Sequence, residues 1–143
     1  MIKVVNPEEN DFVIDYKYCN NAYTVADERC IEVPWLLQNI KNLKKKQMKV
    51  LDVGCVGSKY LDDLKSIGCE VYGNDIRNIG DTLSLKGVFV GKINEIKTDV
   101  AFDAIICISV LEHIGLGGYG SKRENFKNLQ VVALRTMANL LNN

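Results

Sequence analysis

The stretch that decides the fold of this chain is Lys49-Val50-Leu51-Asp52-Val53-Gly54-Cys55-Val56-Gly57-Ser58. Its apolar half predicts a buried strand, and its two glycines predict a tight turn that leaves room beside the backbone. A helical pattern follows from Tyr60, and a second apolar run ends in Asp75. This order of elements, with an acid at the tip of the second strand, is typical of sites that hold the ribose of a nucleotide-like cofactor.

Short apolar runs alternate with helical patterns along the rest of the chain. Strands are predicted over 50–53, 70–74, 88–91 and 102–109. Helices are predicted over 31–43, 59–67 and 123–141, and the stretch 81–85 fits a short helix. Pro34 is expected in the opening turn of the first helix, and Gly68 is expected to end the second. This order predicts a three-layer α/β fold with a mostly parallel sheet and right-handed crossovers.

Length and composition narrow the class of protein. The 143 residues fit a single domain over 1–143, with an N-terminal segment over 1–30 and an α/β core over 31–143. Lysine plus arginine and aspartate plus glutamate number 18 each, which argues against a surface tuned to nucleic acid. The sequence contains no apolar run of about 20 residues and no signal-peptide core, so we predict no membrane partner.

The 5 cysteines are widely spaced, odd in number, and form no Cys-x-x-Cys pair. This usage predicts a reducing, cytoplasmic setting in which cysteine acts as a small apolar residue. Neither a disulfide framework nor a zinc or other metal site is expected.

The prediction of function depends mainly on two aspartates. Asp52 can fix the turn and attract a positively charged ligand group, while Gly54 and Gly57 remove the Cβ atoms that would keep a ligand off the backbone. Asp75 can accept hydrogen bonds from both hydroxyls of a ribose, and Ile76 can pack on an adenine face. The alternative for Asp52 alone is a turn-capping role, and the alternative for Asp75 alone is a surface aspartate in an Asn-Asp turn. Together, with a helix between them, they favour the cofactor site.

The predicted strand over 102–109 is followed by a segment from Ser109 to His113, which is expected at the same edge of the sheet as Asp52 and Asp75. His113 is the sole histidine, and a neutral imidazole is suited to removing a proton near pH 7. We weigh two roles for His113 equally, a catalytic base and a residue that packs or caps the next segment.

Three motifs carry a resemblance to a known family: Val50 to Gly57, Asp75, and the run from Phe102 through Leu111-Glu112-His113. From residue 31 onward the chain resembles the class I S-adenosylmethionine-dependent methyltransferases. The resemblance implies their Rossmann-like fold, S-adenosylmethionine as cofactor, and His113 as the catalytic candidate. The cofactor-binding residues that it implies are Asp52, Gly54, Cys55, Gly57, Asp75, Ile76, Ile93 and Ser109.

The sequence departs from the family pattern in three places. Val56 stands where most members have glycine. Lys92 replaces an aspartate that usually accepts from the adenine amino group, so Asn94, Glu95 or a backbone carbonyl would have to substitute. The sequence ends after the helix that follows the fourth strand, so the fold is expected to be truncated there. The apolar fourth strand would then be an edge, which we expect a second copy or another chain to cover.

The resulting hypothesis is a methyltransferase that acts on a small-molecule, lipid or sugar-type acceptor, with the acceptor itself unknown. A second hypothesis is a non-catalytic S-adenosylmethionine-binding module or subunit that needs a partner to complete the fold. A third, a nicotinamide-dependent oxidoreductase, fits Asp75 but lacks the Gly-x-Gly-x-x-Gly fingerprint.

Overall fold

A computed structural model gives the fold and describes residues 2–5, 11–19, 27–43, 45–78, 83–117 and 128–142. These residues fall into two compact units, which we describe separately. One lies within Met1–Lys45 and Lys59–Ile67, and the other within Lys46–Ser58 and Gly68–Asn143. A single domain over the whole chain stays a prediction.

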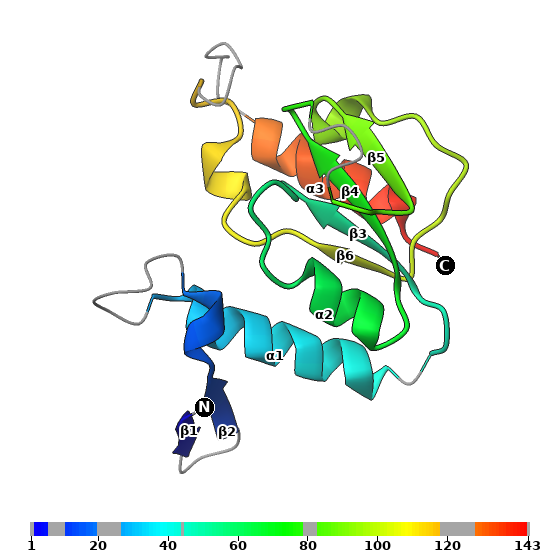
Figure 1. Ribbon diagram of the computed structural model, residues 1–143. Coiled ribbons are helices and arrows are strands. Elements are labelled where there is room, and N and C mark those ends of the chain that lie inside the picture. Colours follow the sequence, from blue (N-terminus) through cyan, green and yellow to red (C-terminus); the bar gives the residue numbers. More distant parts are fainter. Residues whose placement is uncertain are drawn as a thin grey trace. The chain divides into compact units, whose positions relative to one another are not determined.

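A parallel sheet forms the larger unit, as the alternation of strands and helices predicts. Its strands are β3 (Lys49–Val53), β4 (Glu70–Asp75), β5 (Gly87–Val90) and β6 (Ala104–Ile106). They lie in the order β5-β4-β3-β6, so β3 and β4 are central and β6 is at an edge (Figure 1). The expected α/β class and the parallel pairing are confirmed.

The fourth strand is shorter than predicted, and its expected end at residue 109 is wrong. It stops at Ile106 because the chain turns soon afterwards, with Ser109 in the left-handed region at φ +49°. At the other end, Phe102 forms a parallel bridge with Leu141. The chain that leaves the last helix therefore returns to the sheet beside the start of β6.

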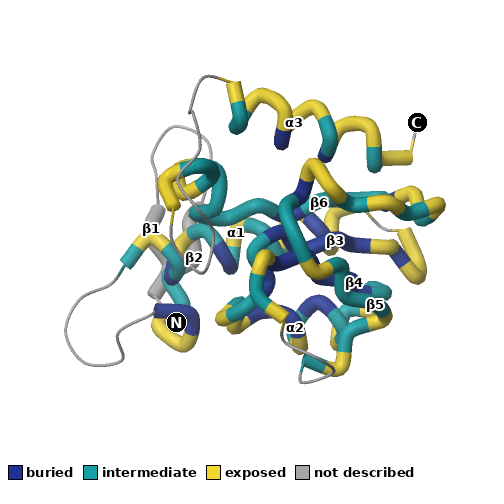
Figure 2. Tube along the Cα trace, turned by 90° about the horizontal axis from the view of Figure 1, so that it is seen from above, coloured by how far each residue is buried: buried dark blue, intermediate teal, exposed yellow. Residues whose placement is uncertain are grey.

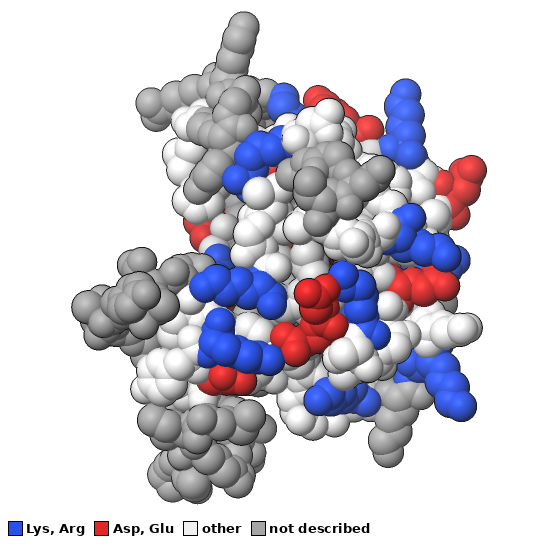
Figure 3. Space-filling model, in the orientation of Figure 1, with Lys and Arg blue, Asp and Glu red and all other residues white. Residues whose placement is uncertain are grey.

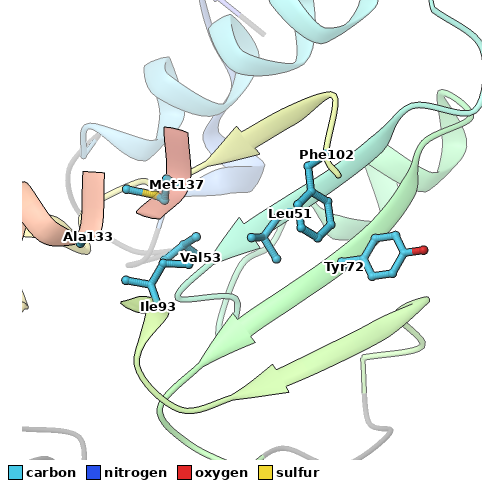
Figure 4. Close-up of a cluster of buried hydrophobic side chains, with 7 residues drawn as sticks. All are labelled: Leu51, Val53, Tyr72, Ile93, Phe102, Ala133 and Met137. Carbon is cyan, nitrogen blue, oxygen red and sulfur yellow. The ribbon is translucent and has the colours of Figure 1, made fainter. Parts of the chain in front are cut away.

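The last helix, α3 (Leu129–Leu140), runs along one side of the sheet (Figure 2). Side chains alternate between the two faces of a strand, so one set points toward this helix. Together with side chains of the helix itself, this set forms a buried apolar cluster (Figure 4). Its members are Leu51, Val53, Tyr72, Ile93, Phe102, Ala133 and Met137. Burial of apolar side chains of this size contributes about 1.5–3 kcal/mol each and fixes the face that the sheet turns toward α3.

The start of α3 differs from the predicted residue 123. Asn128 has a φ of +86°, which a right-handed helix does not allow, so the helix begins at Leu129. Residues 123–127 of the predicted helix lie outside the described residues, as do residues 81 and 82 of the short helix expected over 81–85. Residues 83–85 are described and are not helical.

In the smaller unit, α1 (Arg29–Asn42) begins earlier than expected and places Pro34 inside the helix rather than in its opening turn. Proline has no N–H to donate to the carbonyl four residues back, which here belongs to Cys30. The N–H of Asp15 donates to that carbonyl instead, at 2.9 Å. The segment before the helix thus supplies the hydrogen bond that Pro34 removes.

The smaller unit also contains elements that the weak periodicity of residues 1–30 did not reveal. An antiparallel hairpin of β1 (Ile2–Val5) and β2 (Asp11–Ile14) precedes the short 3-10 helix η1 (Tyr16–Tyr18). Lys17 and the Tyr18 hydroxyl both donate to Asp63 of α2 (Leu61–Ser66), at 3.0 and 2.8 Å.

Two further 3-10 turns complete the larger unit, η2 (Ile93–Glu95) and η3 (Leu111–His113). Gly68 has a φ of +91°, consistent with its predicted role as a helix stop. None of the helices in the described part of the chain has the length and apolar character that a membrane span requires.

Candidate functional site

The predicted site lies at the carboxyl ends of the parallel strands, where open α/β sheets bind their ligands. In the register of β3 with β4, Asp52 lies opposite Gly73. Successive side chains in a strand alternate between faces, so Asp75, two residues beyond Gly73, is on the same face as Asp52. The two predicted carboxylates therefore share one face of the sheet, the one opposite Leu51 and Tyr72.

Asn74 ties three strand ends together at this edge. Its carbonyl accepts from the N–H groups of Gly54 and Cys55, at 2.7 and 3.1 Å. Its side-chain amide donates to the carbonyls of Phe89 and Gly91, both at 2.9 Å. Asn74 is almost fully buried, so these bonds satisfy a polar group that would otherwise be costly. The signal that could have revealed this role is a polar residue at the end of an apolar strand.

The carboxylate of Asp75, only 4% exposed, is surrounded by hydrogen-bond donors. Oδ1 accepts from the backbone N–H and the Nε–H of Arg77, both at 2.9 Å. Oδ2 accepts from Arg77 Nη2 at 2.9 Å and from the N–H of Val56 at 3.2 Å. The Val56 bond ties Asp75 to the glycine turn. Arg77 was missed, although the Asp-x-Arg spacing could have suggested it.

The charge state of Asp75 follows from these contacts. Burial raises the pKa of this carboxyl, but the hydrogen bonds and positive charge of Arg77 and the N–H of Val56 outweigh it. The net effect is a pKa lowered below the ordinary value, so Asp75 is ionised at neutral pH.

The two glycines of the turn, both with positive φ, are not equivalent. A Cβ built on Gly54 would lie 2.4 Å from Cγ2 of Val110, so the side chain of Val110 occupies the space that this glycine leaves open. A Cβ on Gly57 would meet nothing within 4 Å. Gly57 thus leaves open space beside the backbone, whereas Gly54 accommodates the segment after β6. A ligand contact at either glycine stays a prediction.

Asp52 and Cys55 are both fully buried at this edge. Burial, followed by the negative charges of Asp52 and Asp75, raises the pKa of the Cys55 thiol to about 12. A Cβ built on Gly73, which lies opposite Asp52, would be 2.6 Å from Sγ of Cys55, so Cys55 lies beside these strand ends. Cys55 is therefore a protonated, apolar component of the site rather than a thiolate nucleophile at neutral pH.

The remaining predicted residues lie at different depths. Ile76, directly after β4, is 37% exposed and has a free face for an apolar ligand group. Ile93 is instead buried in the cluster of Figure 4, on the side of the sheet that faces α3. Lys92, at the position of the expected acceptor, has its Nζ 3.9 Å from Oε1 of Glu95.

Ser109 and His113 follow β6. The left-handed conformation of Ser109 is uncommon for a residue other than glycine and is a feature found at functional turns. The imidazole of His113 is about half exposed, and its Nε2 lies 4.0 Å from Oε1 of Glu112. No group of three potential metal ligands occurs among the residues that the structure describes.

A search of solved structures identifies the fold. Magnesium protoporphyrin IX methyltransferase (ChlM) from Synechocystis PCC 6803, solved with bound S-adenosylmethionine, matches at 21% sequence identity with a TM-score of 0.52. The match covers 78% of this chain and 52% of that one. This chain has the fold of the S-adenosylmethionine-dependent methyltransferases. It spans about half the length of that relative.

A second similar structure is the TehB-like S-adenosylmethionine-dependent methyltransferase from Corynebacterium glutamicum ATCC 13032, at 18% identity and a TM-score of 0.46. That match covers 70% of each chain. No protein-family model matches the sequence, and no curated protein matches it.

The contact of Gly54 with Val110 predicts a specific pattern of stabilities. Gly54→Ala should lower the free energy of unfolding by about 2–4 kcal/mol, because it adds overpacking to the strain of a positive φ. Gly57→Ala, which meets no neighbour, should cost about 1 kcal/mol. In a Val110→Ala background the cost of Gly54→Ala should fall toward that of Gly57→Ala. Urea unfolding of the four variants measures these values, and an unchanged cost would contradict the geometry.

The lowered pKa of Asp75 predicts a pH dependence of stability. Its folded pKa lies below the unfolded value of about 4, so the stabilisation is present above that value and is lost as the pH falls through the folded pKa. Arg77→Gln should flatten the acid limb of a plot of unfolding free energy against pH. Lys86→Gln, which removes an exposed cation at the start of β5, should leave that limb unchanged. Equal slopes in both variants would contradict the assigned pairing.

Proposed function

We propose that this chain binds S-adenosylmethionine at the carboxyl edge of its sheet and transfers the methyl group to a small-molecule, lipid or sugar-type acceptor. The bond from the Val56 N–H to Asp75 carries this proposal, because it joins the glycine turn to the acid in a buried setting. The likeness to a fold that holds S-adenosylmethionine in ChlM supports the choice of cofactor.

The residues at this edge fit the proposed cofactor. The carboxylate of Asp75 suits the two hydroxyls of a ribose, and the exposed side of Ile76 suits an adenine face. Open space at Gly57 allows close approach to the turn. The carboxyl of Asp52, when ionised, suits the positive charge of a sulfonium nucleoside.

S-adenosylmethionine, when bound, supplies a methyl group that is already activated on a sulfonium. The protein then has mainly to position an acceptor, which is itself a large source of rate. His113 is the candidate base for a hydroxyl or amine acceptor, and its exposure leaves it accessible to one. Ser109 precedes it on the same segment and is the candidate contact between this segment and the cofactor.

A second candidate function is a cofactor-binding module or subunit without activity of its own. The position of β6 at the edge of the sheet favours it, because a partner strand could complete both the sheet and the acceptor site. Methyl transfer by the purified chain alone would exclude this alternative.

Calorimetry with S-adenosylhomocysteine tests the proposed cofactor site. We expect saturable binding by the native chain, a loss of about tenfold or more in Asp75→Asn, and no comparable binding of NAD. Transfer of a labelled methyl group from S-adenosylmethionine to a pool of small-molecule acceptors tests catalysis. Absence of binding and of transfer, in the native chain and in Arg77→Gln alike, would overturn the proposed function.

We also propose that a second copy or another chain covers β6 and the neighbouring outer side of α3. Three exposed apolar side chains of α3 support this: Val131, Val132 and Leu134. On the face drawn in Figure 3, described cations and anions are interspersed rather than gathered by sign, which argues against a nucleic-acid partner on that face. The five free cysteines support a reducing, cytoplasmic setting.

Light scattering coupled to size-exclusion chromatography measures the oligomeric state. We expect a mass at least twice that of one chain at high concentration. Val131→Lys combined with Leu134→Lys should shift it toward the single chain, because charge on an apolar interface opposes association. A stable monomer of the native protein at every concentration would contradict self-association.

A further inference from the structure

We propose that Arg77 is a specificity-determining residue that competes with the ligand for Asp75. Its guanidinium occupies the acceptor positions that a ribose diol would take, so a nucleoside binds only by displacing it. This inference rests on the proposed function, and it names the chemistry that the site selects: a nucleoside with both ribose hydroxyls.

The hydrogen-bonding capacity of Asp75 is the first step of the argument. An ionised carboxylate has two oxygens and about four acceptor positions. The structure fills them with four donors: the N–H groups of Val56 and Arg77, and the Nε and Nη2 of the Arg77 guanidinium. A ligand hydroxyl therefore has no acceptor position at Asp75 until one of these donors leaves.

The four donors differ in how readily they can leave. The two backbone N–H groups are held by the glycine turn and by the end of β4. The guanidinium is on a flexible side chain that is 39% exposed, so a rotation can carry it into solvent. Its departure frees two positions, the same number that the two hydroxyls of a ribose can fill.

The competition should be strong because the guanidinium bonds are charge-assisted and bidentate, and so stronger than bonds from neutral hydroxyls. A third contact, from Nη2 to the carbonyl of Val56 at 3.4 Å, holds the guanidinium against the turn. When the binding-competent form is a minority, the apparent affinity falls by its fraction. A guanidinium that is docked about 90% of the time would weaken nucleoside binding about tenfold.

The same competition selects among ligands. A nucleoside with two hydroxyls replaces both guanidinium bonds, whereas one without them leaves Asp75 buried with two acceptor positions empty. An unmade hydrogen bond to a buried charge carries a large penalty. Arg77 should therefore remain docked in the presence of a ligand that lacks both hydroxyls.

Affinity measurements on Arg77 variants test the competition. Calorimetry with S-adenosylhomocysteine should show binding about tenfold tighter in Arg77→Gln than in the native chain. Arg77→Lys keeps the charge but cannot form two parallel hydrogen bonds to the carboxylate. Its affinity for S-adenosylhomocysteine should therefore be intermediate between those of the native chain and Arg77→Gln. Lys86→Gln removes a cation from the opposite end of the sheet and should match the native chain.

A spectroscopic measurement on the native chain does not depend on any variant's stability. The Nε–H resonance of Arg77 is identified by its absence from the Arg77→Gln spectrum. Saturation with S-adenosylhomocysteine should move it to the position of a free arginine and remove its protection from solvent exchange. An analogue without the two ribose hydroxyls should leave it unmoved.

The outcomes separate the two proposals. Tighter binding by Arg77→Gln together with release of the Nε–H in the native chain supports the competition. If the native chain binds too weakly to saturate, binding by Arg77→Gln supports it without the spectroscopic measurement. Equal or weaker binding by Arg77→Gln, or an Nε–H that stays docked in the complex, overturns it while the proposed cofactor site stands. If neither the native chain nor Arg77→Gln binds S-adenosylhomocysteine, both the proposed function and the proposed competition are overturned.

Discussion

The parallel pairing of β3 with β4 is the constraint on which the candidate site depends. Its register places Asp52 opposite Gly73 and carries Asp75 to the end of the next strand on the same face. A shift of one residue would turn Asp75 toward the apolar side that packs on α3. The buried side chains of Leu51 and Tyr72 prevent that shift, so the core fixes the geometry of the site.

Hydrogen bonds at the strand ends convert this register into a rigid edge. Asn74 holds the glycine turn with its carbonyl and the end of β5 with its amide, while Asp75 holds the N–H of Val56. These bonds lie where water is largely excluded, so losing any partner would leave a costly buried group. The polar atoms of β4 therefore position the turn, and the apolar atoms of the same strand position the sheet.

The sequence predicted what depends on local pattern and missed what depends on distant contacts. Apolar runs and glycines identified β3, β4 and the turn, and the acid at a strand tip identified Asp75. The contact between Gly54 and Val110 joins residues far apart in the chain, and no periodicity encodes it. The end of β6 was missed for a related reason, because an apolar run does not reveal that Ser109 turns left-handed. Arg77 is a different case, since its position was visible but its pairing with Asp75 was not.

The pairing of Arg77 with Asp75 connects the stability of the fold to the affinity of the site. Without a ligand, a carboxylate that is 4% exposed would lose hydration and lower the stability of the strand end. Arg77 compensates for that loss in the ligand-free chain, and the same bonds then oppose a ribose. A chain lacking the guanidinium should therefore bind more tightly and fold less stably at neutral pH. A residue that merely braced the site would change both properties in the same direction, so the opposite signs identify the competition.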